Sequence, residues 1–198
     1  MAEAKSSLES SFPNTQVLTY SASITDPMRI AEIVNEVGTI DILILNAGFA
    51  EAKMVLEIDP KDMLEMFNTN VVAPLALIKA VVTRPGRAKE ITVINISTNA
   101  SHTLMPTLSG YGASKAAFTQ IMGHVQFEFG ESGVRSFSMH PGSFYTSMSG
   151  KFLDKDTMDA FGEDSKIWSV LGFMLSIADG LYSQSTRCHG SVALQSRG

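Results

Sequence analysis

The chain has 198 residues, a length typical of one domain, and 44% of them are hydrophobic while 18% are charged. This composition is that of a globular protein large enough to bury a core without disulfides or metals. The net charge of −5 gives no electrostatic attraction to nucleic acid or to an anionic membrane, so neither is expected as a partner.

The sequence carries no evident signal for export or for membrane insertion. The polar start at Met1–Lys5 lacks the apolar segment of a signal peptide, and no apolar run reaches the roughly 18 residues that a membrane span requires. The single cysteine, Cys188, excludes an internal disulfide and favours a reducing compartment. We therefore expect a cytoplasmic protein.

Short β-rich runs alternate with longer helical patterns, which is typical of a parallel α/β sheet. Gln16–Tyr20 predicts a strand. Asp26 and Pro27 then supply the N-cap and first-turn proline of a helix that Gly38 ends. Asp41–Leu45 is apolar on both alternating faces, which predicts a central strand covered by helices on both sides.

The second half of the chain continues this alternation. The predicted elements are a helix from Asp59-Pro60 to about Val82, a buried strand Ile91–Ser97, a long helix Ser109–Phe129, a strand Val134–His140 and a last strand Gly190–Leu194. The pattern weakens after Gly150. We expect one domain, with a recognisable core over 1–150 and a divergent lid and C-terminal segment over 151–198.

The segment Tyr111–Lys115 carries the strongest chemical signal. A Tyr and a Lys four positions apart on a helix project from the same face, so an ammonium sits beside a phenol. A free Tyr has a pKa of about 10, and a nearby lysine in a partly dry site lowers it. Such a Tyr exchanges a proton with an alcohol or carbonyl oxygen near neutral pH. On its own the spacing also occurs by chance in surface helices.

Polar and small residues follow three of the predicted strands. Asn46-Ala47-Gly48 follows the first buried strand, Ser97 and Thr98 end the next, and Pro141-Gly142 with Thr146 follows the third. Because open α/β sheets bind ligands at the carboxyl ends of their strands, these residues are expected to share one rim with Tyr111.

This combination, in this order, resembles the short-chain dehydrogenase/reductase family from about Gln16 to Thr146. The resemblance implies an α/β, Rossmann-like doubly wound parallel sheet, here lacking the first β-α-β unit. It implies an oxidoreductase that moves hydride between NAD or NADP and an alcohol/carbonyl pair. It also implies pairing of the long helices into a homodimer or homotetramer.

The resemblance assigns a role to each site residue. The catalytic residues are Tyr111 as the proton donor and acceptor, Lys115 on the ribose hydroxyls, Thr98 on the substrate oxygen and Asn70 as the anchor of a relay water. The cofactor-binding residues are Asn46, Ala47, Gly48 and Ser23 on the adenine-ribose side, Lys115, and Pro141, Gly142 and Thr146 around the carboxamide.

The sequence departs from the family pattern in three places. Thr98 stands thirteen positions before the tyrosine, where the family has a serine, and Ser23 takes the place of an acidic residue. We favour Thr98 over Ser97, because neighbouring side chains on a strand face opposite sides. No glycine-rich turn precedes Gly38, so we expect a shortened form of a longer enzyme and an exposed edge on the strand Asp41–Leu45.

One alternative remains beside an active enzyme. A catalytically silent Rossmann-like fragment that acts only as a binding or dimerising module would explain the missing glycine turn. The histidines show no ligand spacing, so no metal is expected; they are His102, His124, His140 and His189. The sequence does not distinguish NAD from NADP.

Overall fold

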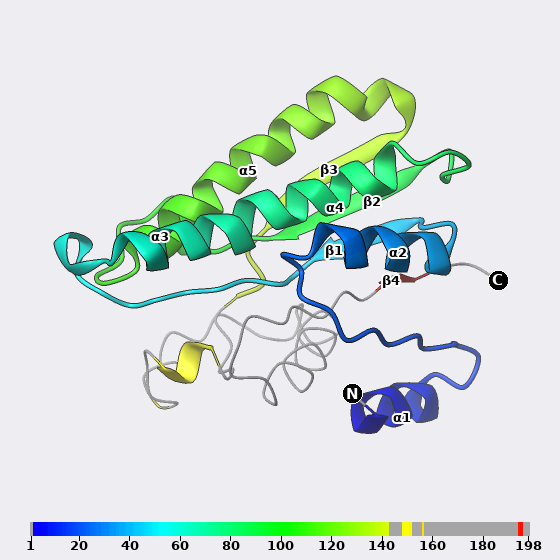
Figure 1. The fold of residues 1–198 in the computed structure, drawn as a ribbon, viewed down its shortest axis with the longest axis horizontal. Coiled ribbons are helices and arrows are strands. Elements are labelled where there is room, and N and C mark those ends of the chain that lie inside the picture. Colours follow the sequence, from blue (N-terminus) through cyan, green and yellow to red (C-terminus); the bar gives the residue numbers. More distant parts are fainter. Residues whose placement is uncertain (1, 143–147, 152–155, 157–193, 196–198) are drawn as a thin grey trace.

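The computed structural model describes residues 2–142, 148–151, 156 and 194–195 (Figure 1). The helices are α1 (Ala2–Ser11), α2 (Pro27–Val37), α3 (Pro60–Phe67), α4 (Ala73–Val82) and α5 (Ser109–Phe129). The strands are β1 (Ile42–Leu45), β2 (Ile91–Ile96), β3 (Val134–Met139) and β4 (Leu194–Gln195). A π-helical segment, η2 (Asn68–Val72), joins α3 to α4, and 3-10 turns lie at Val55–Glu57, Asn99–Ser101, Gly130–Ser132 and Ser149–Lys151.

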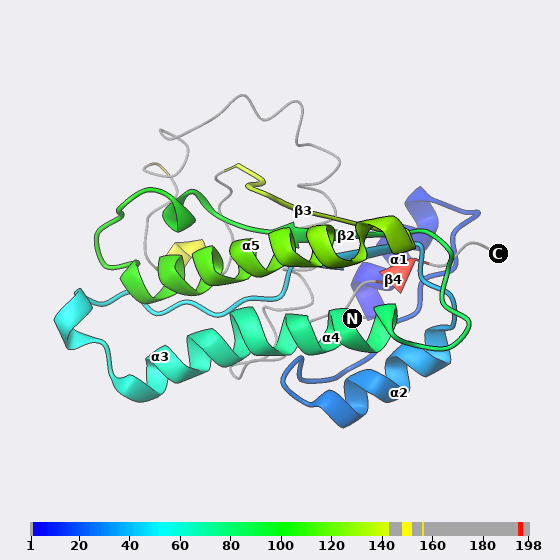
Figure 2. The same cartoon turned by 90° about the horizontal axis from the view of Figure 1, so that it is seen from above.

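The four strands form one sheet in the order β3-β2-β1-β4. β1, β2 and β3 are parallel, and β4 pairs antiparallel with β1 at its outer edge. The core lies between one face of this sheet and the helices α2, α4 and α5, which run side by side in Figure 2. Its largest fully buried side chains include Phe118, Leu43, Leu77 and Met122.

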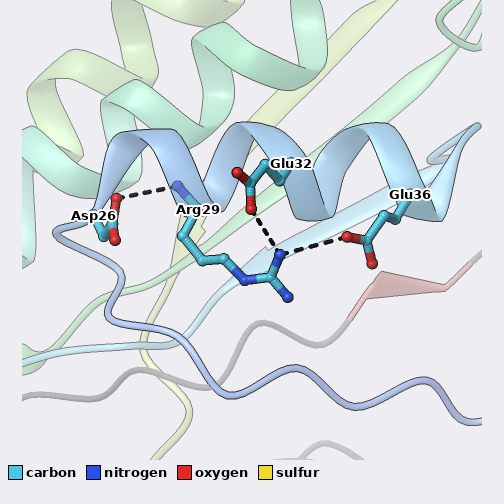
Figure 3. A network of polar contacts seen from close by, with 4 residues as sticks. All are labelled: Asp26, Arg29, Glu32 and Glu36. Atoms are coloured by element: carbon cyan, nitrogen blue, oxygen red, sulfur yellow. Dashed lines mark hydrogen bonds and ion pairs between the residues drawn. The ribbon is translucent and has the colours of Figure 1, made fainter.

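Helix α2 begins and ends as its sequence predicts. The carboxylate of Asp26 accepts a hydrogen bond from the backbone N–H of Arg29, and Gly38 at the C-terminus has a φ of 83°. Figure 3 shows that the Arg29 side chain also reaches Glu32 and Glu36 one and two turns along the helix. These ion pairs lie on the outer surface of α2, where solvent screens them.

The predicted helix from Pro60 to Val82 is interrupted by η2, and Pro74 explains why. A proline has no N–H to give to the carbonyl four residues earlier, and its ring clashes with that carbonyl. Here the carbonyl is that of Asn70. The chain widens into a π turn instead, in which the N–H of Ala73 donates to the carbonyl of Asn68.

Gln16–Tyr20 is not a strand, contrary to the sequence-based prediction. The backbone N–H of Val17 donates to the Glu9 side chain of α1, an element that the sequence analysis did not predict, at 3.3 Å. The β1 edge that an added strand would need is paired with β4 through Ile42 and Leu43. The exposed edge expected for this strand is therefore partly covered. Of the predicted last strand, only Leu194 lies within the described residues.

The described helices cover one face of the sheet, whereas coverage of both faces was expected. On the opposite face Ile44, Ile94 and Phe137 are cross-strand neighbours, and Phe137 is 47% exposed. Ile42 on the same side of β1 is 39% exposed. This apolar row has no helix packed on it among the described residues.

The stretch Pro60–Val82 is long and apolar enough to cross a membrane, judged by length and composition alone. Half of it is buried inside the protein. Because its buried side chains Leu77, Ile78 and Val81 belong to the sheet-packed core, it fits a buried core helix.

Candidate active site

The carboxyl ends of the three parallel strands bring the predicted site residues to one edge of the sheet. The segment Asn46–Gly48 follows β1, Thr98 follows β2, and Pro141 follows β3. The backbone N–H of Ser97 still pairs with the Met139 carbonyl at 2.7 Å, which holds the last two strand ends together.

Tyr111 and Lys115 lie in the first turns of α5, on the face that meets this edge. The Lys115 Nζ is 5.9 Å from the centroid of the Tyr111 ring and donates a 2.9 Å hydrogen bond to the Ile96 carbonyl. Gly112 between them permits close contact, because a Cβ there would lie 2.4 Å from the backbone oxygen of Ala100. The predicted pairing of phenol and ammonium is thus present.

The pKa values of this pair differ from the expectation that Lys115 lowers the pKa of Tyr111. Burial raises the pKa of Tyr111 to about 12 and lowers that of Lys115 to about 8. Both shifts have the same cause, since a low-dielectric surrounding disfavours the charged form of either group. The ammonium lies beside the ring and bonds to Ile96, and it does not offset the desolvation of the phenol.

Asn70 connects η2 to the loop after β1. Its side-chain amide makes two hydrogen bonds of 2.8 Å with the backbone of Phe49, accepting from the N–H and donating to the carbonyl. A Cβ added to Gly48 would lie 3.4 Å from Asn70 Oδ1 and 3.5 Å from Lys115 Nζ. Asn70, Gly48 and Lys115 therefore lie next to one another.

Thr98 and Ser97 have separate surroundings. The Ser97 hydroxyl is buried and lies 3.0 Å from that of Thr119 on α5. Thr98 is partly exposed at the strand end, and its hydroxyl accepts a 3.3 Å hydrogen bond from the N–H of Ala100. Thr98 is the more accessible hydroxyl at the rim, in agreement with the preference stated from the sequence.

A small pocket extends from Asn46 and Ala47 under the edge of the sheet. It is lined by Ile24, Ile44, Leu45, Asn46, Ala47, Thr69, Pro74 and Leu77. The Thr69 side chain is 3% exposed and its hydroxyl has no hydrogen-bond partner in the described part of the chain. A buried hydroxyl without a partner is costly unless a ligand or water satisfies it.

The remaining residues predicted to bind the cofactor are Ser23, Pro141, Gly142 and Thr146. The Ser23 hydroxyl is used inside its own turn, 2.7 Å from that of Thr25, while its neighbour Ile24 reaches the pocket. Pro141 and Gly142 follow β3, and Gly142 has a φ of 89°. Thr146 lies outside the described residues, as does Cys188.

The sequence analysis missed three residues that shape this site. They are Thr69, Pro74 and Ser114. A signal for Pro74 was present, because a proline four residues after Asn70 predicts a break in the helix there. Among the described residues, no group of three or more His, Cys, Asp or Glu side chains is arranged to hold a metal.

Comparison with known proteins places the chain in a family. The family model described as short chain dehydrogenase matches residues 1–157. The chain belongs to the short-chain dehydrogenase family.

The chain is 40% identical over 146 residues to the short chain dehydrogenase/reductase AacuD of Aspergillus aculeatus, a match that covers 73% of this chain and 51% of AacuD. It is 36% identical over 160 residues to nsrO, a short chain dehydrogenase/reductase of Aspergillus novofumigatus, with 78% and 55% covered. The chain therefore spans about half of the length of these relatives.

Solved structures agree with the expected Rossmann-like α/β fold. The NADPH-bound carbonyl reductase from chicken fatty liver superposes with a TM-score of 0.64 at 28% sequence identity. This match covers 78% of the present chain and 68% of the reductase.

Proposed function

We propose that this chain carries the catalytic half of an NAD(P)-dependent oxidoreductase that reduces a small carbonyl substrate to an alcohol in the cytoplasm, or runs the reverse reaction. The observation that supports this most strongly is the position of the Lys115 ammonium, which lies 5.9 Å from the Tyr111 ring centroid and would lie 3.5 Å from a Cβ on Gly48, at the carboxyl edge of the sheet. The proposal rests on the side chains and charges at that edge and not on the fold alone.

Tyr111 is the proton donor in this proposal. With a pKa of about 12 its phenol is protonated at neutral pH, which is the form that gives a proton to a carbonyl oxygen. Lys115, with a pKa of about 8, is largely charged at pH 7, and its ammonium lies 5.9 Å from the centroid of the Tyr111 ring.

The residues present fit one end of a nicotinamide cofactor better than the other. Lys115 would bond to the nicotinamide ribose hydroxyls, and Asn46, Ala47 and Gly48 would line the adenine-ribose side. No glycine precedes Gly38, so residues 1–37 offer no glycine turn for the pyrophosphate. When bound, the cofactor supplies the hydride, and NAD and NADP both remain candidates.

In this proposal the backbone carbonyl of Asn70 helps to return protons to Tyr111. Because residue 74 is a proline, the Asn70 carbonyl lacks the usual N–H donor four residues later, and we infer that it accepts a hydrogen bond from a water molecule. Such a water next to Lys115 would return a proton to Tyr111 after each turnover. Thr98 at the strand end would orient the substrate oxygen through its hydroxyl.

The test is hydride transfer from deuterium-labelled NADPH or NADH to a panel of ketones and aldehydes, followed by mass spectrometry of the alcohols. The purified chain is expected to label at least one alcohol. Tyr111→Phe, which keeps the ring and removes the hydroxyl, is expected to lose about 100-fold or more of the rate. Equal labelling by this variant would contradict the role of Tyr111.

We also propose that two copies pair through the outer faces of α4 and α5. Exposed apolar side chains support this, namely Leu75 on α4, Phe127 on α5 and Val72 at the end of η2, and Phe127 is 88% exposed. Gly123 on α5 has no neighbouring atom within 4 Å of an added Cβ, which leaves room for a second helix. Sedimentation analysis is expected to show a dimer that Phe127→Glu weakens.

A further inference from the structure

The side chain of Ser114 lies at the junction of three segments of the active site. It is fully buried on α5, between Tyr111 and Lys115 in sequence. Its hydroxyl donates a 2.7 Å hydrogen bond to the Tyr111 carbonyl and accepts a 2.9 Å hydrogen bond from Asn70 Nδ2. Both the donor and the acceptor capacity of this hydroxyl are thus used at once.

Asn70, the hydrogen-bond partner of Ser114, also binds the loop after β1. Asn70 holds the backbone of Phe49 through two hydrogen bonds of 2.8 Å, and Phe49 follows Gly48 directly. The chain of contacts therefore runs from α5 through Ser114 and Asn70 to the loop after β1. Asn70 is 1% exposed and its bond to Ser114 is buried, so this bond is stronger than one at the surface.

We propose that Ser114 is a positioning residue for the active site. By accepting from Asn70 Nδ2, it fixes which way the Asn70 amide points, so that Oδ1 faces the Phe49 N–H. This keeps Gly48 against Lys115 and sets the distance between α5 and the loop after β1. The inference rests on the proposed function only in treating these residues as an active site.

Ser136 provides a matched control within the same chain. It is also a buried serine, and its hydroxyl donates a 2.7 Å hydrogen bond to a backbone carbonyl of α5, that of Met122. It lies on β3, and its backbone N–H and hydroxyl bond to Gln126 and Met122 of α5. Replacing either serine by alanine removes a buried hydroxyl of the same kind, but only Ser114→Ala removes a bond to Asn70.

The experiment is amide hydrogen exchange of the full chain, followed residue by residue by NMR without cofactor. Ser114→Ala is expected to speed exchange of the Phe49 N–H about 10-fold more than Ser136→Ala does, at similar losses of global stability. Equal acceleration in both variants would overturn the role of Ser114 as a positioning residue.

A second variant keeps the inference testable if Ser114→Ala does not fold. Ser114→Cys preserves shape but is a weaker acceptor, so the Phe49 N–H should exchange faster than in the wild type. A rate equal to that of the wild type would contradict the inference. Because the measurement needs no cofactor, its failure is separate from failure of the proposed function, which shows as absent cofactor binding by the wild type.

Discussion

The ammonium of Lys115 donates its hydrogen bond to the backbone carbonyl of Ile96 over 2.9 Å, at a site where the lysine side chain is almost fully buried. One neutral acceptor does not replace the water that the charge has lost, and burial lowers the pKa of Lys115 from 10.5 to about 8. The folded protein therefore pays a stability penalty at neutral pH that a neutral side chain would avoid.

This penalty predicts a pH dependence of stability. Between about pH 8 and 10.5 the unfolded chain binds the Lys115 proton and the folded chain does not, so the free energy of unfolding rises with pH. Relative to Lys115→Met, the wild type is expected to gain about 2–3 kcal/mol from pH 7 to pH 10. Denaturant unfolding of both proteins at each pH measures this difference.

Tyr111 provides the internal check for that comparison. Its raised pKa of about 12 has the opposite effect, because above pH 10 the unfolded phenol ionises while the folded one does not. Both proteins contain Tyr111, so its contribution cancels in the difference. A stability difference between the wild type and Lys115→Met that stays constant with pH would contradict the buried ammonium.

Two glycines of α5 should respond to alanine in opposite ways. A Cβ on Gly112 would lie 2.4 Å from the Ala100 backbone oxygen, so Gly112→Ala must push α5 from the turn after Thr98, at a cost of about 1–3 kcal/mol. Gly123 has open space around it, and Gly123→Ala should stabilise the helix by up to about 1 kcal/mol. Thermal unfolding compares them, and a loss of stability in both would show that α5 is packed differently.

Replacing Pro74 by alanine should remove the π turn. The new N–H of residue 74 has the Asn70 carbonyl as its natural acceptor, so an ordinary helical turn can close there. We expect Pro74→Ala to gain a protected amide at position 74 and to weaken NADPH binding about 10-fold. Leu75→Ala, at an exposed neighbouring position, is the control. An unprotected amide at position 74 would show that another feature holds the π turn open.

Two substitutions at the N-terminus of α2 compare the contribution of a helix cap with that of surface ion pairs. Asp26→Ala removes the carboxylate that accepts from the Arg29 N–H, and should lower the free energy of unfolding by about 1 kcal/mol. Arg29→Ala removes the outward ion pairs with Glu32 and Glu36 (Figure 3) and should change it very little. Chemical denaturation in low and high salt distinguishes the two, and a larger loss for Arg29→Ala would reverse this ranking.

Local sequence signals predicted the central part of the fold. The Asp26-Pro27 and Asp59-Pro60 pairs mark helix starts that the structure confirms, and α5 has the predicted bounds Ser109–Phe129. The three parallel strands were also found, because their apolar runs are buried on the helix-covered face. Each of these signals is local, so each could be read without knowing the rest of the chain.

The errors concern partners that are distant in sequence. Gln16–Tyr20 has strand-like residues, but a strand needs a neighbour, and its Val17 N–H binds Glu9 instead. The motif residues Tyr111, Lys115 and Asn70 were identified in advance, whereas the link through Ser114 was not. That link joins residues 44 positions apart, and no local pattern shows such a contact.

The most direct test of the central claim is calorimetric titration of the purified chain with NADPH and NADH, with Lys115→Met as the control. We expect the wild type to bind at least one cofactor saturably, and the variant to bind it at least 10-fold more weakly. No binding by a chain that circular dichroism shows to be folded would contradict the claim that this edge of the sheet is a cofactor site.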